Sequence, residues 1–226
     1  MKAARVIAWT LWAAFVVALA AAIYVGFHSP VGSGITVIDA IWYASFIGFP
    51  TAGALVAPRM PRRPLGWILL IAPLLLMVGL SLSELAGFPL QDGNPAAAWM
   101  LWGSTVLFSA GLAPLLIVPL YLPDGELPSS RWQPAGRTMW GFTAAWILGV
   151  MFKPGPLETS ATGVRNPAGL EPLAGIFDVI ETLLGPLALA AIAAGVVSLI
   201  IRFRGARGVA RQQLKWLALG GAGVFV

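Results

Sequence analysis

The chain has 226 residues, of which 58% are hydrophobic and only 10% are charged, and its mean hydropathy is +0.85. A soluble domain normally carries about a quarter charged residues, so this composition excludes a single soluble domain and predicts an all-α, polytopic bundle of transmembrane helices. The chain contains no cysteine, which excludes disulfides, thiol nucleophiles and cysteine-based metal sites.

Long apolar stretches predict most of the membrane spans directly. The hydrocarbon core of a bilayer is about 30 Å thick, which a helix crosses with about 20 apolar residues. Five stretches meet this requirement, namely residues 6–27, 35–57, 65–87, 96–122 and 176–201. Because lipid offers the backbone no hydrogen-bond partner, we expect each of them to be helical. A cleavable signal peptide is the alternative for the first stretch, but its apolar run continues to Phe27.

A sixth predicted span, residues 137–152, is shorter, with an apolar part of only 14 residues from 139 to 152. By length alone it could also lie at the membrane interface. If it spans, twelve of the 14 basic residues fall on one side of the membrane. If it does not, the last basic cluster falls opposite the others, against the positive-inside rule. The twelve are Lys2, Arg5, Arg59, Arg62, Arg63, Arg131, Arg137, Arg202, Arg204, Arg207, Arg211 and Lys215.

We therefore predict six complete spans in a plasma membrane, with the N-terminus in the cytoplasm. This sorting of charge accounts for the net charge of +5 and the pI of about 10.2 without any nucleic-acid partner. Membrane lipids are the expected partners, because basic residues next to spans suit anionic lipid of the inner leaflet.

Four acidic residues near the predicted outer ends form a candidate sensing rim: Asp39, Glu84, Asp178 and Glu181. Asp178 and Glu181 are three residues apart and so share a helix face. Such a rim could bind a cation or a basic peptide. The alternative is that Asp39, Asp178 and Glu181 are solvated carboxylates favoured by the positive end of a helix dipole. We find no catalytic or metal-ligand spacing, and expect no cofactor, no metal and no catalytic residue.

Four loop stretches, taken in order, resemble the membrane-embedded input region of multi-span sensor histidine kinases of bacteria, the kind abundant in actinobacteria. Residues 62–67, Arg-Arg-Pro-Leu-Gly-Trp, resemble the family's Asn-Pro-Ile-Gly-Trp, with Arg63 where Asn is usual. Residues 122–132, Leu-Pro-Asp-Gly-Glu-Leu-Pro-Ser-Ser-Arg-Trp, resemble Phe-Pro-Asp-Gly-Arg-Leu-Pro-Ser-x-Arg-Trp, with Glu126 in place of a basic residue. Residues 166–169, Asn-Pro-Ala-Gly, resemble an outer Asn-Pro-Leu-Gly. Residues 204–216 resemble the basic linker before the family's penultimate span.

The resemblance implies a sensor that passes a signal to a cytoplasmic, dimeric kinase, which phosphorylates a response regulator. The kinase itself is not in this chain, so we expect no enzymatic activity from residues 1–226 alone. Residues 214–226 are apolar but would reach only about 20 Å as a helix, and we expect them to be the truncated start of a seventh span. The residues expected to transmit the signal are Arg204, Arg207, Arg211, Gln212, Gln213, Lys215 and Trp216.

Two other classes remain open from the sequence. A small transporter or permease component would show an internal repeat and polar groups around a cavity in mid-membrane. A membrane scaffold would instead bind a partner protein through its helices or loops. A kinase core encoded downstream of Val226 distinguishes the sensor from both alternatives.

Overall fold

The computed structural model describes residues 2–29, 35–122, 125–157 and 163–205. Their regular secondary structure is helical, apart from one isolated β-bridge between Pro156 and Arg165. The α-helices are α1 (Lys2–His28), α2 (Val37–Ser45), α3 (Gly48–Val56), α4 (Pro64–Gln91), α5 (Ala96–Tyr121), α6 (Gln133–Phe152) and α7 (Ala174–Gly205). Two short 3-10 helices, η1 (Ser130–Trp132) and η2 (Glu171–Leu173), precede α6 and α7.

Four of the described helices are long and apolar enough to cross a membrane: α1, α4, α5 and α7, the last taken together with η2. This confirms the all-α fold and the apolar character of four predicted spans. The predicted span 35–57 is two helices, α2 and α3, and not one. The predicted span 137–152 lies in α6, which starts four residues earlier and has 20 residues, but is not among the four. The predicted seventh span lies outside the described residues.

The break between α2 and α3 has a local cause. Pro50 is the third residue of α3, where its missing N–H costs little, whereas in the interior of one continuous helix it would remove a hydrogen bond. Thr51 donates from both its backbone N–H and its hydroxyl to the carbonyl of Ile47, at 3.2 and 2.7 Å. The start of α3 is thereby fixed at this point of the chain.

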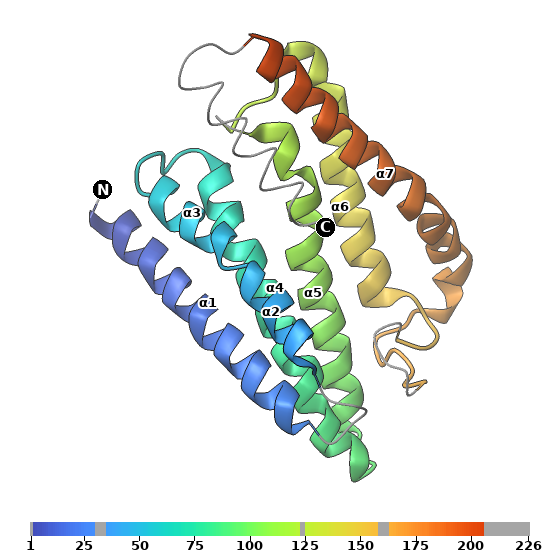
Figure 1. The fold of residues 1–226 in the computed structure, drawn as a ribbon. Coiled ribbons are helices and arrows are strands. Elements are labelled where there is room, and N and C mark those ends of the chain that lie inside the picture. Colours follow the sequence, from blue (N-terminus) through green and yellow to red (C-terminus); the bar gives the residue numbers. More distant parts are fainter. Residues whose placement is uncertain (1, 30–34, 123–124, 158–162, 206–226) are drawn as a thin grey trace.

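The helices run alternately in opposite directions (Figure 1). α1, α4 and α6 point one way, while the pair α2 and α3, α5 and α7 point the other way. One end of the bundle, which we call the basic end, holds the start of α1, the α3–α4 turn, the α5–α6 connection and the end of α7. The acidic end holds the end of α1, the start of α2, the α4–α5 turn and the α6–α7 connection.

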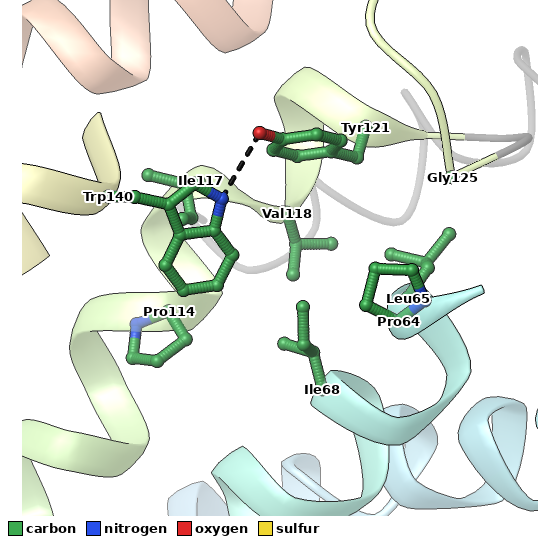
Figure 2. A pocket seen from close by; sticks show the side chains of 9 residues that line it. All are labelled: Pro64, Leu65, Ile68, Pro114, Ile117, Val118, Tyr121, Gly125 and Trp140. Carbon is green, nitrogen blue, oxygen red and sulfur yellow. Dashed lines mark hydrogen bonds between the residues drawn. The ribbon is translucent and has the colours of Figure 1, made fainter. Parts of the chain in front are cut away.

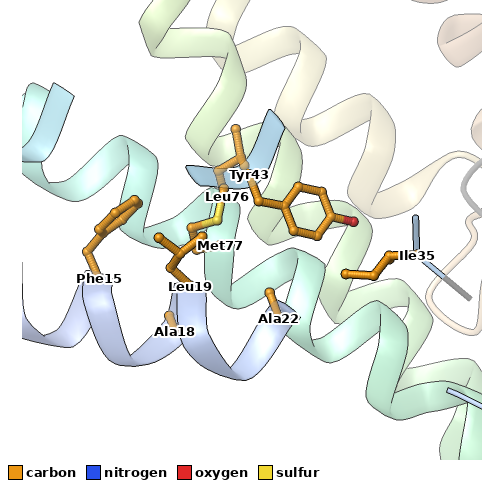
Figure 3. Packing of buried hydrophobic residues seen from close by; sticks show 8 residues of the cluster. All are labelled: Phe15, Ala18, Leu19, Ala22, Ile35, Tyr43, Leu76 and Met77. Atoms are coloured by element: carbon orange, nitrogen blue, oxygen red, sulfur yellow. The ribbon is translucent and has the colours of Figure 1, made fainter. Parts of the chain in front are cut away.

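The core of the bundle is centred on α4, which packs against α1, α3 and α5. One cluster of buried side chains joins α1 and α4 to the segment from residue 35 to α2 (Figure 3). In it, Phe15 of α1 and Leu76 and Met77 of α4 are fully buried, and Tyr43 of α2 is nearly so. Burial of such side chains away from lipid depends on close packing, because lipid is as apolar as the side chains themselves.

Glycines allow α4 and α5 to pack with their backbones in contact. A Cβ at Gly111 of α5 would lie 2.4 Å from the carbonyl oxygen of Ala72, and one at Gly79 of α4 would lie 2.7 Å from the backbone nitrogen of Phe108. Both distances are too short for a real side chain. Small residues at helix contacts are typical of membrane bundles for this reason.

Candidate functional site

At the acidic end, Asp39 is used to start α2. Its carboxylate accepts hydrogen bonds from the backbone N–H and the hydroxyl of Thr36, at 2.7 and 2.6 Å, while its own N–H donates to the Thr36 hydroxyl at 3.2 Å. This is a capping box, which satisfies backbone donors at a helix N-terminus. The placement agrees with the structural alternative for Asp39, a carboxylate that caps a helix.

Glu84 lies on α4 close to Asp39, near enough for their charges to interact. Its side chain is half-buried, and the hydroxyl of Ser29 donates to its backbone carbonyl at 3.4 Å. Tyr43 of the core cluster is also within electrostatic reach of both carboxylates. Asp39 of α2 and Glu84 of α4 are therefore within electrostatic reach of each other, and we call them the Asp39–Glu84 group.

Glu181 belongs to a second group, between α6 and α7. Its carboxylate accepts a hydrogen bond from the ammonium group of Lys153, the residue that follows α6. Asp178 is exposed one turn earlier on α7. A second ion pair, Arg165 with Glu171 at 3.0 Å, lies in the same connection.

The predicted rim is therefore divided between two groups at one end of the bundle. The Asp39–Glu84 group and the Asp178–Glu181 group belong to helices that make no substantial contact with one another, since α7 packs against α5 and α6 while α2 packs against α1. Of the four rim carboxylates, that of Glu181 is already paired within the chain, with Lys153. Whether either group binds a ligand stays a prediction.

The second group borders a cleft between α6 and α7. Its lining includes Trp146 and Val150 of α6 and Phe177 and Leu184 of α7, together with the Lys153–Glu181 ion pair. Pro156, Leu157 and Asn166 of the α6–α7 connection also line this cleft. The cleft leaves about 60 Å³ for the centres of water-sized molecules. Its lining is mostly apolar, with one charged edge.

Asn166, the first residue of the Asn-Pro-Ala-Gly stretch, caps the C-terminus of α6. Its side-chain amide donates to the carbonyls of Lys153 and Met151, at 2.8 and 3.1 Å, and its side-chain oxygen accepts from the N–H of Ala168 at 2.9 Å. A Cβ at Gly169 would lie 2.8 Å from Cα of Pro154. The stretch needs an amide because helix C-terminal carbonyls otherwise lack donors. It needs a glycine because a side chain at position 169 would collide with Pro154.

At the basic end, the first two family-like stretches are in direct contact. The guanidinium of Arg63, immediately before α4, forms an ion pair with the carboxylate of Glu126 at 2.7 Å. Arg202 near the end of α7 donates to the backbone carbonyl of Glu126. We call these three residues the junction. It joins the α3–α4 turn, the α5–α6 connection and α7, three segments far apart in the sequence.

Two further contacts hold α7 beside the junction. The hydroxyl of the buried Ser198 donates to the carbonyl of Leu120 at 3.2 Å, near the C-terminus of α5. A Cβ at Gly195 would lie 2.9 Å from Cβ of Pro119. The end of α7 therefore rests directly on the end of α5.

A second cleft opens at the basic end between α4, α5 and α6 (Figure 2). Its lining is mostly apolar, from Ile68 of α4 and Pro114, Ile117 and Val118 of α5. The indole N–H of Trp140 on α6 donates to the hydroxyl of Tyr121 at 3.1 Å along one wall (Figure 2).

Of the residues predicted to transmit the signal, Arg204 lies in the described part of the chain. It is exposed in the last turn of α7. The other predicted transmission residues lie outside the described residues: Arg207, Arg211, Gln212, Gln213, Lys215 and Trp216. The sequence reading missed Ser198 and the Tyr121–Trp140 pair. Their residue types carry no signal, because the contacts depend on which helices are neighbours.

The described residues hold no group of three or more potential metal ligands. Four of their helices are long and apolar enough to cross a membrane, which is consistent with an α-helical membrane protein. No family model, curated protein or solved structure matches the chain.

Proposed function

We propose that this chain is the membrane-embedded input region of a sensor histidine kinase, with six membrane crossings and the basic end in the cytoplasm. The six crossings are the four long helices, the pair α2 and α3 taken together, and α6. The alternating directions in Figure 1 support this count. A 20-residue helix such as α6 reaches about 30 Å, the thickness of the hydrocarbon core.

The cytoplasmic placement of the basic end rests on charge. The helix ends and turns gathered there carry Lys2, Arg5, Arg59, Arg62, Arg63, Arg131, Arg137, Arg202 and Arg204. The acidic end, within the described residues, carries only Lys153 and Arg165 as basic side chains. An excess of Lys and Arg favours the cytoplasmic side.

The observation that carries the kinase assignment is the ion pair between Arg63 and Glu126. These are the two positions at which a departure from the family pattern changes the charge of a loop stretch, one toward positive and the other toward negative. Because the two departures neutralise each other in direct contact, they support the resemblance.

The same contacts suggest a route for the signal. A ligand or a change in the membrane that favours a different packing of α6 and α7 would change the tilt of α7, whose end leads into the linker from Arg204 to Trp216. The junction holds that end through Arg202. A signal needs two packings with different affinity for the stimulus. The proposed partners are a second copy of the chain, through the kinase region, and a response regulator.

The reading frame that contains this chain tests the assignment first. We expect it to continue past Val226 into a histidine kinase core. The whole product, purified in nanodiscs with labelled ATP, should acquire acid-labile phosphate and transfer it to a response regulator. A stop codon shortly after Val226, or no phosphorylation, would contradict the proposal and favour a transporter component or a scaffold.

The junction provides a sharper test in the same assay. The Glu126→Arg variant places like charges together and should change the rate of phosphorylation. The double variant Arg63→Glu, Glu126→Arg restores opposite charges and should return the rate toward that of the original protein. Arg165→Gln, at the acidic end, is the matched control for loss of an exposed ion pair.

A further inference from the structure

The apolar cleft of Figure 2 shares a wall with another cleft, which is more polar and which we call the polar cleft. Tyr121 and Trp140 belong to both linings, and the polar cleft adds Gln133, Gly136 and Arg137 of α6 together with Leu127. The apolar cleft is open to its surroundings and leaves about 40 Å³ for the centres of water-sized molecules. Its lining on α5 extends from Pro114 to Tyr121, about 10 Å along the helix axis. The Tyr121–Trp140 pair, drawn in Figure 2, is therefore the part of the wall that the apolar and the polar cleft have in common.

This arrangement matches the depth profile of a membrane leaflet. Tyr and Trp side chains favour the headgroup level, where one end is apolar and the other meets water. Arg137 and Gln133 lie toward the start of α6 from Trp140, and so toward the basic end, whereas Pro114 lies deeper on α5. The polar cleft therefore lies at headgroup level and the apolar cleft at the level of acyl chains.

The charges beside the clefts favour an anion. Glu126 is the only acidic residue at the basic end in the described part of the chain, and it is bound to Arg63 and Arg202. Arg137 is exposed and has no ion-pair partner among the described residues. A guanidinium group binds phosphate well, because its planar donors match phosphate oxygens in pairs. The Tyr121 hydroxyl accepts from Trp140 and still has its own proton to donate.

We propose that the two clefts together bind one anionic phospholipid from the leaflet at the basic end. A segment of one acyl chain lies along the apolar cleft against Ile68, Pro114 and Ile117. The phosphate lies at Arg137, with Gln133 and the Tyr121 hydroxyl as further donors. The inference shares with the proposed function only the placement of the basic end in a lipid leaflet, and does not depend on a kinase.

Native mass spectrometry of the purified chain tests the proposal directly. The chain is released from mixed micelles containing equal amounts of phosphatidylglycerol and phosphatidylcholine, and retained lipids are counted. We expect one phosphatidylglycerol to be retained in preference. Arg137→Gln should lower its retention on the order of fivefold, the effect of one basic residue at a charged membrane surface. Equal retention of the two lipids would overturn the proposal.

Two further variants separate a built site from general attraction to a basic surface. Arg59→Gln removes an exposed arginine at the same end and should leave retention unchanged; an effect equal to that of Arg137→Gln would overturn the proposal. Ile68→Phe fills the apolar cleft without changing charge and should also lower retention. Glycerol 3-phosphate, added as a soluble headgroup, should compete poorly, and efficient competition would overturn the role of the acyl chain. Size-exclusion chromatography checks that each variant is folded.

Discussion

At the end of α6, the side chain of Asn166 forms hydrogen bonds with several backbone groups. Its amide reaches two carbonyls that the helix leaves without donors, and its oxygen closes the turn at Ala168. An aspartate has the same shape but only acceptor atoms. The role of Asn166 therefore depends on the NH₂ group, which makes it testable by one isosteric change.

We expect Asn166→Asp and Asn166→Ala to lower the free energy of unfolding by about 1–3 kcal/mol, the usual cost of leaving partly buried polar groups without a partner. Thermal unfolding in detergent measures the change. Asn94→Ala is the control, because Asn94 is exposed and its side chain accepts from only one backbone N–H, that of Ala96. If Asn166→Asp were as stable as the original protein, the amide would not be the group that matters.

The ion pair of Arg63 and Glu126 is exposed on both sides, with 40% and 64% of the two side chains accessible. Exposed pairs contribute little to stability because water and salt screen them. A double-mutant cycle with Arg63→Ala and Glu126→Ala should give a coupling free energy of about 0.2–1 kcal/mol, reduced in high salt. A much larger or salt-independent coupling would contradict an exposed pair. The Arg63–Glu126 ion pair is therefore better suited to set the relative positions of the α3–α4 turn and the α5–α6 connection than to stabilise the fold.

At the scale of helices, the contact between α4 and α5 is set by Gly79 and Gly111. At Gly111 the nearest atoms to an added Cβ would be the carbonyl oxygen of Ala72 at 2.4 Å and the backbone nitrogen of Leu76 at 2.6 Å. Backbone atoms cannot rotate away as a side chain can. Any residue larger than glycine at this position must separate the two helices.

We therefore expect Gly111→Ala to prevent normal assembly, seen as loss of the monodisperse peak in size-exclusion chromatography of a fluorescent fusion. Gly141→Ala in α6 is the matched control. A Cβ there meets nothing within 4 Å, and alanine favours a helix over glycine by about 1 kcal/mol. A normal elution profile for Gly111→Ala would mean that the helices are not in close contact.

The sequence predicts helices better than it predicts their breaks and ends. Hydropathy alone located α1, α4, α5 and α7, because each is a long apolar run. It joined α2 to α3, since Pro50 is apolar and does not interrupt the run. It also started α6 too late, because Gln133 and Arg137 are polar although the backbone there is already helical. Hydropathy measures the affinity for lipid and not the hydrogen bonding of the chain.

For the whole molecule, the arrangement of the helices gathers residues that the sequence keeps apart. The sequence predicted that the four rim residues lie at one end, since alternation of spans determines that. It could not predict their separation into two groups, because the lateral order of helices depends on packing contacts such as Gly53 of α3 against Gly66 of α4. The junction was unpredictable for the same reason.

The absence of cysteine makes the topology directly testable with single-cysteine variants. We expect cysteines at Asn94 and Gly155, at the acidic end, to react in intact cells with a maleimide that cannot cross the membrane. Cysteines at Met60 and Arg131, at the basic end, should react only after the cells are permeabilised. Labelling of Arg131→Cys and Gly155→Cys from the same side would show that α6 does not cross.

α7 is much longer than a bilayer needs. Its 32 residues reach about 48 Å, against about 30 Å of hydrocarbon, and it lies obliquely across α5 and α6 (Figure 1). If it turns about its contact at Ser198, the helix acts as a lever with a long outer arm of about 36 Å. A tilt of about 5° would then displace the outer tip by about 3 Å, while the short arm that carries Arg202 moves by less than an ångström.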